Sequence, residues 1–172
     1  LALIRVSAPE ASLLNAKFPR AVSARHSIGQ MLPDVVIGCL HQVMPDRVPC
    51  EGASCIWNPV FMNGIEAETG NLKVDRFVIN PIFNGGTGAR PHKDGMSTTA
   101  FPSGVRTTST EVNEATSPLI FWKKEYRPNS GGKGEFRGGL GQTIEISHRY
   151  GSDFVMSKMF DRIIYPALGR DG

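Results

Sequence analysis

Apolar residues recur at intervals of three and four in the first third of the chain. They are Ile28, Met31, Leu32, Val35, Val36, Cys39, Leu40 and Val43. This spacing gathers them on one side of an α-helix, so the pattern predicts a helix with a buried apolar face. Pro19 suits the first turn of that helix, and Pro45 and Pro49 end it. Pro33 lies inside and removes a backbone hydrogen bond, which predicts a kink or two abutting helices.

The pattern changes after residue 54 to short runs of branched and aromatic residues. The runs at 55–61 and 72–83 are separated by the turn signals Asn63-Gly64 and Thr69-Gly70-Asn71, and they predict paired strands. Residues 84–118 contain little apolar periodicity, which predicts a loop of about 35 residues. Loops of that length in compact domains are usually functional or disordered.

Two further strands are predicted at residues 119–128 and 143–150. The tail at 153–168 is apolar enough to be ordered, but its pattern fits a helix and a strand equally. The predicted class is therefore α+β, with one kinked amphipathic helix followed by a strand-dominated, glycine-loop-rich region. We expect residues 1–172 to form a single domain and, because both ends stop abruptly, to be a fragment of a longer chain.

Two tracts hold a large share of the 19 glycines, at residues 80–95 (NPIFNGGTGARPHKDG) and 128–141 (PNSGGKGEFRGGLG). Glycine interrupts helices and strands, so both tracts are predicted loops, and loops that carry charged residues are frequent sites of function. We expect the two tracts to converge on one surface of the fold, with the strands between them forming the core.

Composition excludes several classes of function. The net charge of +3 is small and scattered, which argues against nucleic acid as a partner. No apolar run approaches the length that spans a bilayer, so no membrane segment is predicted. Three cysteines at irregular spacings match neither a zinc site nor a disulfide framework, and reduced thiols in the cytoplasm explain them most simply.

His92 and Asp94 lie two positions apart in the first glycine tract. An extended backbone would let both side chains face one ligand or metal ion, although a third ligand would still be needed. The alternative is that Asp94-Gly95 forms a turn and His92 is simply exposed. The spacing leaves both interpretations open.

Glu111 and Glu114 could form a carboxylate pair for acid–base chemistry, or they could belong to a helix start capped by Thr110. In the second glycine tract, successive backbone N–H groups with Lys133 and Arg137 could bind an anion, or could form a tight turn between strands. The tract is not an ATP-binding P-loop, because Gly134 follows Lys133 where that motif needs Ser or Thr.

Four segments in order carry a resemblance to a known family: ASLLNAKFPRAVSARHSIGQ, FNGGTGARPHKDG, TSTEVNEATSPL and RPNSGGKGEFRGGLGQ. Together they resemble the B-type subunits of ATP-dependent hydantoinases and oxoprolinases, a family that includes acetone and acetophenone carboxylase subunits. The similarity runs from about residue 5 to residue 148. Family members are considerably longer, and the match falls on their middle-to-late region.

The resemblance implies that ATP is bound by a partner, an ATPase-type A subunit, which phosphorylates a cyclic amide whose ring the B-type subunit then opens with water. On that scheme His92, Asp94, Glu111 and Glu114 are candidate base or water-orienting groups. Arg137 with the neighbouring glycine amides is a candidate anion holder. The carboxylase branch implies a divalent metal, whose ligands match no position here. Carboxylation, or a scaffold and interface role without catalysis, remain the alternatives.

Overall fold

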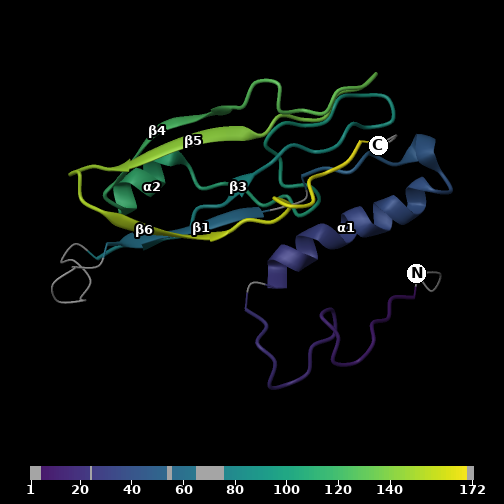
Figure 1. The fold of residues 1–172 in the computed structure, drawn as a ribbon, viewed down its shortest axis with the longest axis horizontal. Coiled ribbons are helices and arrows are strands. Elements are labelled where there is room, and N and C mark those ends of the chain that lie inside the picture. Colours follow the sequence, from purple (N-terminus) through teal and green to yellow (C-terminus); the bar gives the residue numbers. More distant parts are fainter. Residues whose placement is uncertain (1–4, 24, 54–55, 65–75, 170–172) are drawn as a thin grey trace.

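The computed structural model of the protein describes residues 5–23, 25–53, 56–64 and 76–169. It has the predicted α+β class, with an N-terminal arm and a long helix beside a body of antiparallel strands (Figure 1). The elements in chain order are α1 (Arg25–His41), the short 3-10 helix η1 (Pro45–Arg47), β1 (Ile56–Asn63), β2 (Val78–Ile79), β3 (Phe83–Asn84), α2 (Thr110–Thr116), β4 (Leu119–Tyr126), β5 (Gln142–His148) and β6 (Phe154–Met159).

Strand β1 organises the first sheet. Along one edge it pairs antiparallel with β6, in a register from Asn58↔Met159 to Asn63↔Phe154. Its two ends pair with the short strands β2 and β3, also antiparallel. The C-terminal part of the chain therefore returns to complete a sheet that begins near residue 56.

The second sheet is the hairpin of β4 and β5, paired from Leu119↔His148 to Tyr126↔Gln142. A bulge interrupts the ladder at Trp122, whose indole Nε1 donates to Ser147 Oγ at 2.7 Å. The connection between these strands is the second glycine tract. Helix α2 packs on β4, at the end of the body opposite to that tract (Figure 1).

The core lies between the two sheets. Phe61 of β1, Phe83 of β3, and Leu119 and Phe121 of β4 are buried together with Phe77. Residues of the remaining strands pack against this cluster, namely Ile79, Ile144, Ile146 and Phe154. Burial of large apolar side chains from both sheets is the main force that holds them face to face.

The strand predictions are confirmed for the first run and for the two later ones, whereas the described part of the run at 72–83 forms two separate two-residue strands, β2 and β3. Strands form at the first predicted run, at 119–126 and at 142–148, and the ambiguous tail forms β6. Part of the predicted strand at 72–83, with the turn signal at Thr69-Gly70-Asn71, lies outside the described residues. The expected loop at 84–118 is wrong in one part, because it contains α2, whose seven residues are too few to give a periodic signal.

Three details of the helix prediction can be compared with the structure. Of the two alternatives predicted at Pro33, two abutting helices are excluded, because α1 is one 17-residue element with Pro33 inside it, and the kink stays a prediction. It begins at Arg25 in the described residues, and Pro19 lies in a turn in which Arg20 N donates to Lys17 O at 3.0 Å.

The third detail concerns which face of α1 is buried. The residues of α1 that are buried are Gln30 and Asp34, whereas Val35 and Val36 are mostly exposed. Gln30 Nε2 donates to Phe101 O at 2.8 Å, and Asn58 Nδ2 lies 3.3 Å from His26 Nε2. Polar contacts attach this helix to the body, so its apolar face points outward.

Replacement of Leu119 tests the position of the core. Leu119 has no exposed surface, so Leu119→Ala should lower the free energy of unfolding by about 2–5 kcal/mol, as expected for a cavity in a packed core. Chemical denaturation followed by circular dichroism measures this change. The control Val78→Ala, at a residue that is 70% exposed, should change stability by about 0.5 kcal/mol or less. Equal effects of the two substitutions would contradict the core described above.

Candidate functional site

The two glycine tracts lie against each other, as the sequence predicts. Gly95 N donates to Arg137 O at 2.7 Å, and Gly139 N donates to Thr87 O at 2.9 Å. The ladder continues beyond the first tract, where Thr98 N donates to Leu140 O at 2.9 Å. Segments more than 40 residues apart in the sequence are therefore joined backbone to backbone.

Glycine is required at this junction because the backbones approach too closely for a side chain. A Cβ atom at Gly86 would lie 2.0 Å from Gly139 O, and one at Gly139 would lie 2.1 Å from Met96 O. Both distances are far below a van der Waals contact. Close packing thus explains much of the glycine content of the two tracts.

Two further segments, residues 50–53 and the C-terminal tail, complete this junction. Cys50 N donates to Ala89 O, and Ala53 N donates to Gly86 O, both at 2.8 Å. The C-terminal tail then folds over this segment, because Arg162 forms an ion pair with Glu51. Leu168 N donates to the second carboxylate oxygen, Glu51 Oε2, at 3.0 Å.

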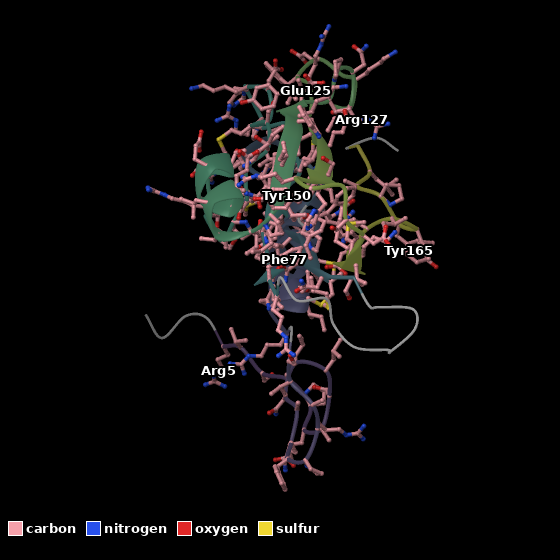
Figure 2. The ribbon with its side chains drawn as sticks, turned by 90° about the vertical axis from the view of Figure 1, so that its left-hand side faces the viewer. Arg5, Phe77, Glu125, Arg127, Tyr150 and Tyr165 are labelled. Carbon is pink, nitrogen blue, oxygen red and sulfur yellow. The ribbon has the colours of Figure 1, made fainter. Side chains whose placement is uncertain are left out.

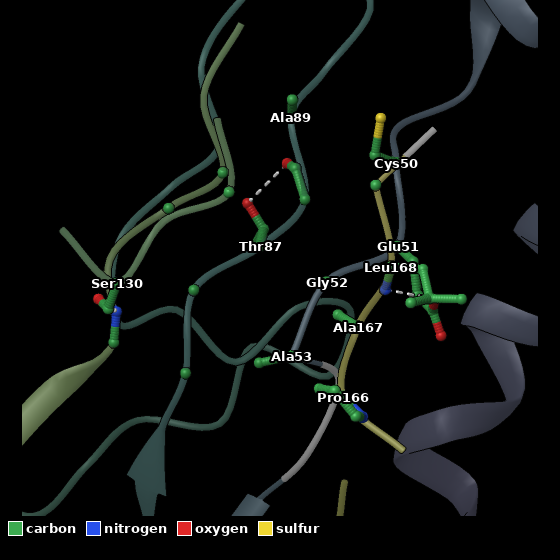
Figure 3. Close-up of a pocket in the computed structure, with 18 of the residues that line it drawn as sticks. Cys50, Glu51, Gly52, Ala53, Thr87, Ala89, Ser130, Pro166, Ala167 and Leu168 are labelled. Atoms are coloured by element: carbon green, nitrogen blue, oxygen red, sulfur yellow. Dashed lines mark hydrogen bonds between the residues drawn. The ribbon is translucent and has the colours of Figure 1, made fainter. Parts of the chain in front are cut away.

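These four segments enclose a pocket of about 830 Å³. Its walls come from residues within the segments 50–53, 83–91, 127–142 and 161–169, and from Trp57. Figure 3 shows Glu51 and the tail residues Pro166 to Leu168 along one wall, with Thr87 and Ser130 across from them. The volume is in the range that proteins use for small-molecule ligands.

Basic side chains outnumber acidic ones around this pocket. Its lining includes Arg90, Arg127, Lys133 and Arg162 against Glu51, Glu135 and Asp161. Glu51 is committed to its ion pair, and the Arg90 guanidinium donates to Asp94 O at 2.9 and 2.7 Å. Lys133 and Arg127 are exposed, and together with backbone N–H groups they make the pocket suitable for an anionic or carbonyl-bearing ligand.

Three polar atoms of the pocket residues are buried and have no hydrogen-bond partner within the described ranges: Asn84 Oδ1, Asp161 Oδ2 and Arg162 Nε. Arg162 also has a left-handed backbone, with φ of 58°. A non-glycine residue in that region costs about 1 kcal/mol or more, and such costs concentrate at functional sites. These adjacent residues thus carry an acceptor, Asp161 Oδ2, and a donor, Arg162 Nε–H, that lack hydrogen-bond partners.

His92 and Asp94 do not lie on an extended strand. Arg90 N donates to Lys93 O at 2.8 Å, which closes a turn with His92 exposed at its tip. The turn falls at Pro91-His92, not at Asp94-Gly95 as the alternative prediction had it. Asp94 Oδ1 accepts a hydrogen bond from Arg137 N at 2.7 Å. One oxygen of this carboxylate therefore clamps the two glycine tracts together.

Glu111 and Glu114 lie on α2, which Ser109 caps in place of the predicted Thr110: Ser109 Oγ accepts from Val112 N at 3.3 Å. A hydrogen bond from the backbone, helped by the Ser109 hydroxyl, lowers the pKa of Glu111. Glu114 Oε1 accepts from Phe121 N at 2.7 Å. Both carboxylates have local structural partners, and neither lines the pocket.

Arg137 contributes its backbone to the junction of the tracts through its N–H and its carbonyl oxygen. Its side chain is exposed, and the residues on either side of it, Phe136 and Gly138, line the pocket. Arg137 itself is not among the residues that line the pocket. In the part of the chain that the structure describes, no three His, Cys, Asp or Glu residues gather closely enough to hold a metal ion.

Sequence reasoning missed the contribution of the C-terminal tail. Arg162 lies 111 residues from its partner Glu51, and no local sequence motif predicts an ion pair between such distant residues. Trp57, which stacks on Phe160 with ring centroids 4.6 Å apart, was likewise predicted only as a strand residue.

None of the helices among the described residues has both the length and the apolar character needed to cross a bilayer.

Comparison with known proteins identifies similar chains. A family model described as hydantoinase B/oxoprolinase matches residues 1–172. The chain is 29% identical over 145 residues to a putative D-/L-hydantoinase chain of the B type from Pseudomonas sp. (strain NS671), a match that covers 84% of this chain and 23% of that protein. It is 29% identical over 170 residues to 5-oxoprolinase PfmaA of Pestalotiopsis fici, covering 98% of this chain and 13% of that one.

An uncharacterised protein of Methanocaldococcus jannaschii is 31% identical over 163 residues, which is 94% of this chain and 27% of that protein. The chain thus spans about a quarter or less of the length of these relatives. Among solved structures, nucleotide-free acetone carboxylase is similar in fold, with a TM-score of 0.52 at 20% identity. That similarity covers 68% of this chain and 15% of the carboxylase chain.

Replacement of Gly139 tests the close approach of the tracts. Gly139→Ala should lower the free energy of unfolding by about 1–3 kcal/mol, because the new methyl group must displace backbone atoms. Gly132→Ala is a matched control in the same tract, since nothing lies within 4 Å of its Cβ position. Thermal unfolding of both variants measures the difference. A Gly139→Ala protein as stable as Gly132→Ala would show that the tracts do not meet in this way.

Proposed function

The chain belongs to the hydantoinase B/oxoprolinase family, and from this we propose that it forms part of the B-type subunit of an ATP-dependent cyclic-amide hydrolase. In this proposal ATP is bound by an ATPase-type A subunit, which phosphorylates the amide oxygen of the substrate. The B-type subunit then completes the hydrolytic opening of the ring. We assign the complex to the cytoplasm, in keeping with the free thiols of Cys39 and Cys50.

The observation that carries the proposal is the pair of buried polar atoms without partners on Asp161 and Arg162, two residues that line the pocket. A ring amide presents its N–H and its carbonyl oxygen side by side. Both protein atoms are almost fully covered in this structure, so the two side chains would turn toward the ligand on binding, with Asp161 Oδ2 accepting from the ring N–H and Arg162 Nε–H donating to the ring oxygen. A buried donor and acceptor that both gain partners favour binding, because each otherwise bears an uncompensated desolvation cost. The Trp57 ring offers a flat apolar surface for a planar ligand.

Ring opening needs water, a base and stabilisation of negative charge. Phosphorylation makes the amide carbon a better electrophile, so the remaining task is positioning and charge stabilisation. Lys133 lines the pocket, as do Phe136 and Gly138 on either side of Arg137, and we assign Lys133 and Arg137 to hold the developing anion. His92 is the candidate base, because its ring is exposed beside the pocket residue Pro91.

Asp94, Glu111 and Glu114 each accept a structural hydrogen bond, which makes them weaker candidates for the base. Asp94 is best treated as a positioning residue, since it holds the backbone of Arg137.

A second candidate function is a scaffold and subunit-interface segment without catalysis. The observation that favours it is the direct backbone packing of the glycine tracts, which accounts for those residues without a ligand.

Carboxylation, as in the acetone carboxylase of similar fold, is distinguished from ring hydrolysis by its co-substrate. Dependence of turnover on bicarbonate would identify the carboxylase branch, and incorporation of solvent oxygen into a ring-opened product would identify the hydrolase.

Binding of a cyclic amide to the isolated chain tests the pocket. Titration with hydantoin or 5-oxoproline should shift the NMR signals of the Asp161 backbone and the Arg162 Nε–H. Asp161→Asn should weaken that binding by about 10-fold or more, since a hydrogen bond to a charged group is worth about 1.5–3 kcal/mol. Glu135→Gln, the same chemical change at an exposed residue of the pocket, is the control and should bind normally. Shifts confined to other regions, or equal effects of the two variants, would remove this pocket from the site.

Replacement of Arg137 tests its role in the assembled enzyme. Arg137→Lys should lower kcat by about 10²-fold, because a point charge cannot reproduce the two-pronged contact of a guanidinium with an oxyanion. The melting temperature should stay unchanged, since among the described residues the hydrogen bonds of Arg137 are made by its backbone. Unchanged turnover per folded enzyme would exclude Arg137 from the catalytic machinery.

A further inference from the structure

The segment at residues 161–169, which we call the strap, forms one wall of the pocket without being part of a helix or strand. Six of its nine residues line the pocket. The strap is nevertheless exposed from residue 163 onward. Tyr165 is 82% exposed and lies at the outer side of the molecule (Figure 2). One wall of the pocket is thus made by a segment that packs little against the rest of the chain.

A single carboxylate attaches the strap to the body. Glu51 Oε1 pairs with the Arg162 guanidinium, and Glu51 Oε2 accepts from Leu168 N at 3.0 Å. Among the described residues, these two contacts are the hydrogen bonds that join the strap to the remainder of the chain. The glycine tracts, by contrast, are joined by several bonds between backbones. Release of one side chain, that of Glu51, therefore frees both attachment points of the strap at once.

The start of the strap is fixed more firmly than the strap itself. Phe160, the residue before it, stacks on Trp57 with ring centroids 4.6 Å apart and an angle of 9° between the ring planes. Strand β6, which ends one residue earlier, is paired with β1 along its whole length. A loop segment with one fixed end and one releasable contact can move as a unit, with the change in backbone angles confined to a few residues.

The closed position of the strap carries a cost that opening relieves. Asp161 Oδ2 and Arg162 Nε are buried without partners in the closed strap, and both would be hydrated if the strap were lifted. This cost offsets part of the stabilisation that the contacts with Glu51 provide. Segments held by few contacts of this kind open locally without unfolding of the whole protein. A ligand that gives these two atoms partners would remove the same cost and favour the closed strap.

We therefore propose that the strap is a gate of the pocket. Its release from Glu51 admits a small ligand, and its return to Glu51 encloses that ligand. This inference rests on the proposed function in one respect, namely that this pocket is the ligand site. Its tests use the chain without a cyclic amide, so failure of the gate and failure of the proposed function are distinguishable.

Nitrogen-15 relaxation of the ligand-free chain tests the attachment by Glu51. In Glu51→Ala the order parameters of the backbone amides between Ile163 and Leu168 should fall below about 0.6, the range of flexible backbone, from a higher value in the wild type. The matched control is Glu145→Ala, which removes the ion pair of Glu145 with Lys123 on the β4–β5 hairpin and should leave the strap unchanged. A strap that is equally ordered in Glu51→Ala, or equally mobile in the wild type, would overturn the proposal.

Alkylation of Cys50 tests access to the pocket. Cys50 lines the pocket beside Glu51 and is half-buried, whereas Cys39 on α1 is exposed and serves as an internal reference. In Glu51→Ala, iodoacetamide should react about 10-fold faster with Cys50 and at an unchanged rate with Cys39, because the open population is larger.

A second variant separates opening of the strap from a change of charge beside the thiol. Leu168→Pro removes the N–H that Glu51 Oε2 accepts and leaves the carboxylate next to Cys50 in place. It should also speed the alkylation of Cys50. Faster reaction in Glu51→Ala alone would be an effect of the lost charge and would overturn the gate, as would unchanged rates in both variants.

Discussion

The direct contact between the backbones of the two glycine tracts is the constraint on which the rest of the site depends. Gly86 and Gly139 approach so closely that neither position accepts a Cβ atom. The contact fixes the connection between β4 and β5 against the segment that follows β3. It thereby links the two sheets at a point that their apolar core does not reach. Several residues that line the pocket are glycines for the same reason, and backbone hydrogen bonds join the loops that carry them.

The sequence predicted the features that are encoded locally. Strand patterns identified β1, β4 and β5, and the glycine tracts were expected to converge because charged glycine loops at strand ends tend to share a surface. The orientation of α1 was predicted wrongly, because the apolar face was expected to be buried. Apolar periodicity shows that a helix has an apolar face, but not which surface that face contacts. Here Gln30 and His26 attach the opposite face to the body by polar contacts, so the rule that apolar residues turn inward fails within this chain.

The sequence predicted where the candidate site lies better than it predicted which residues form it. His92, Asp94 and Arg137 do lie at the junction of the tracts. However, Asp94 accepts a hydrogen bond from the backbone N–H of Arg137. The pair Asp161 and Arg162 comes from a tail whose sequence pattern fits a helix and a strand equally. Arg162 reaches the pocket through its ion pair with Glu51, which belongs to a segment more than a hundred residues earlier. Contacts between such distant residues arise from the topology of the sheet and leave no local pattern.

The pairing of β1 with β6 determines the order in which the chain can fold. Residues 58–63 find their partners only at residues 154–159, so nearly a hundred residues must be synthesised before that edge of β1 is covered. Contacts of such long sequence separation form slowly, because the closure of a long loop costs entropy before any pairing compensates for it. During synthesis the growing chain exposes an unpaired strand edge, the kind of surface that promotes aggregation. Efficient production of this protein therefore depends on keeping that edge away from other chains until the last strand emerges.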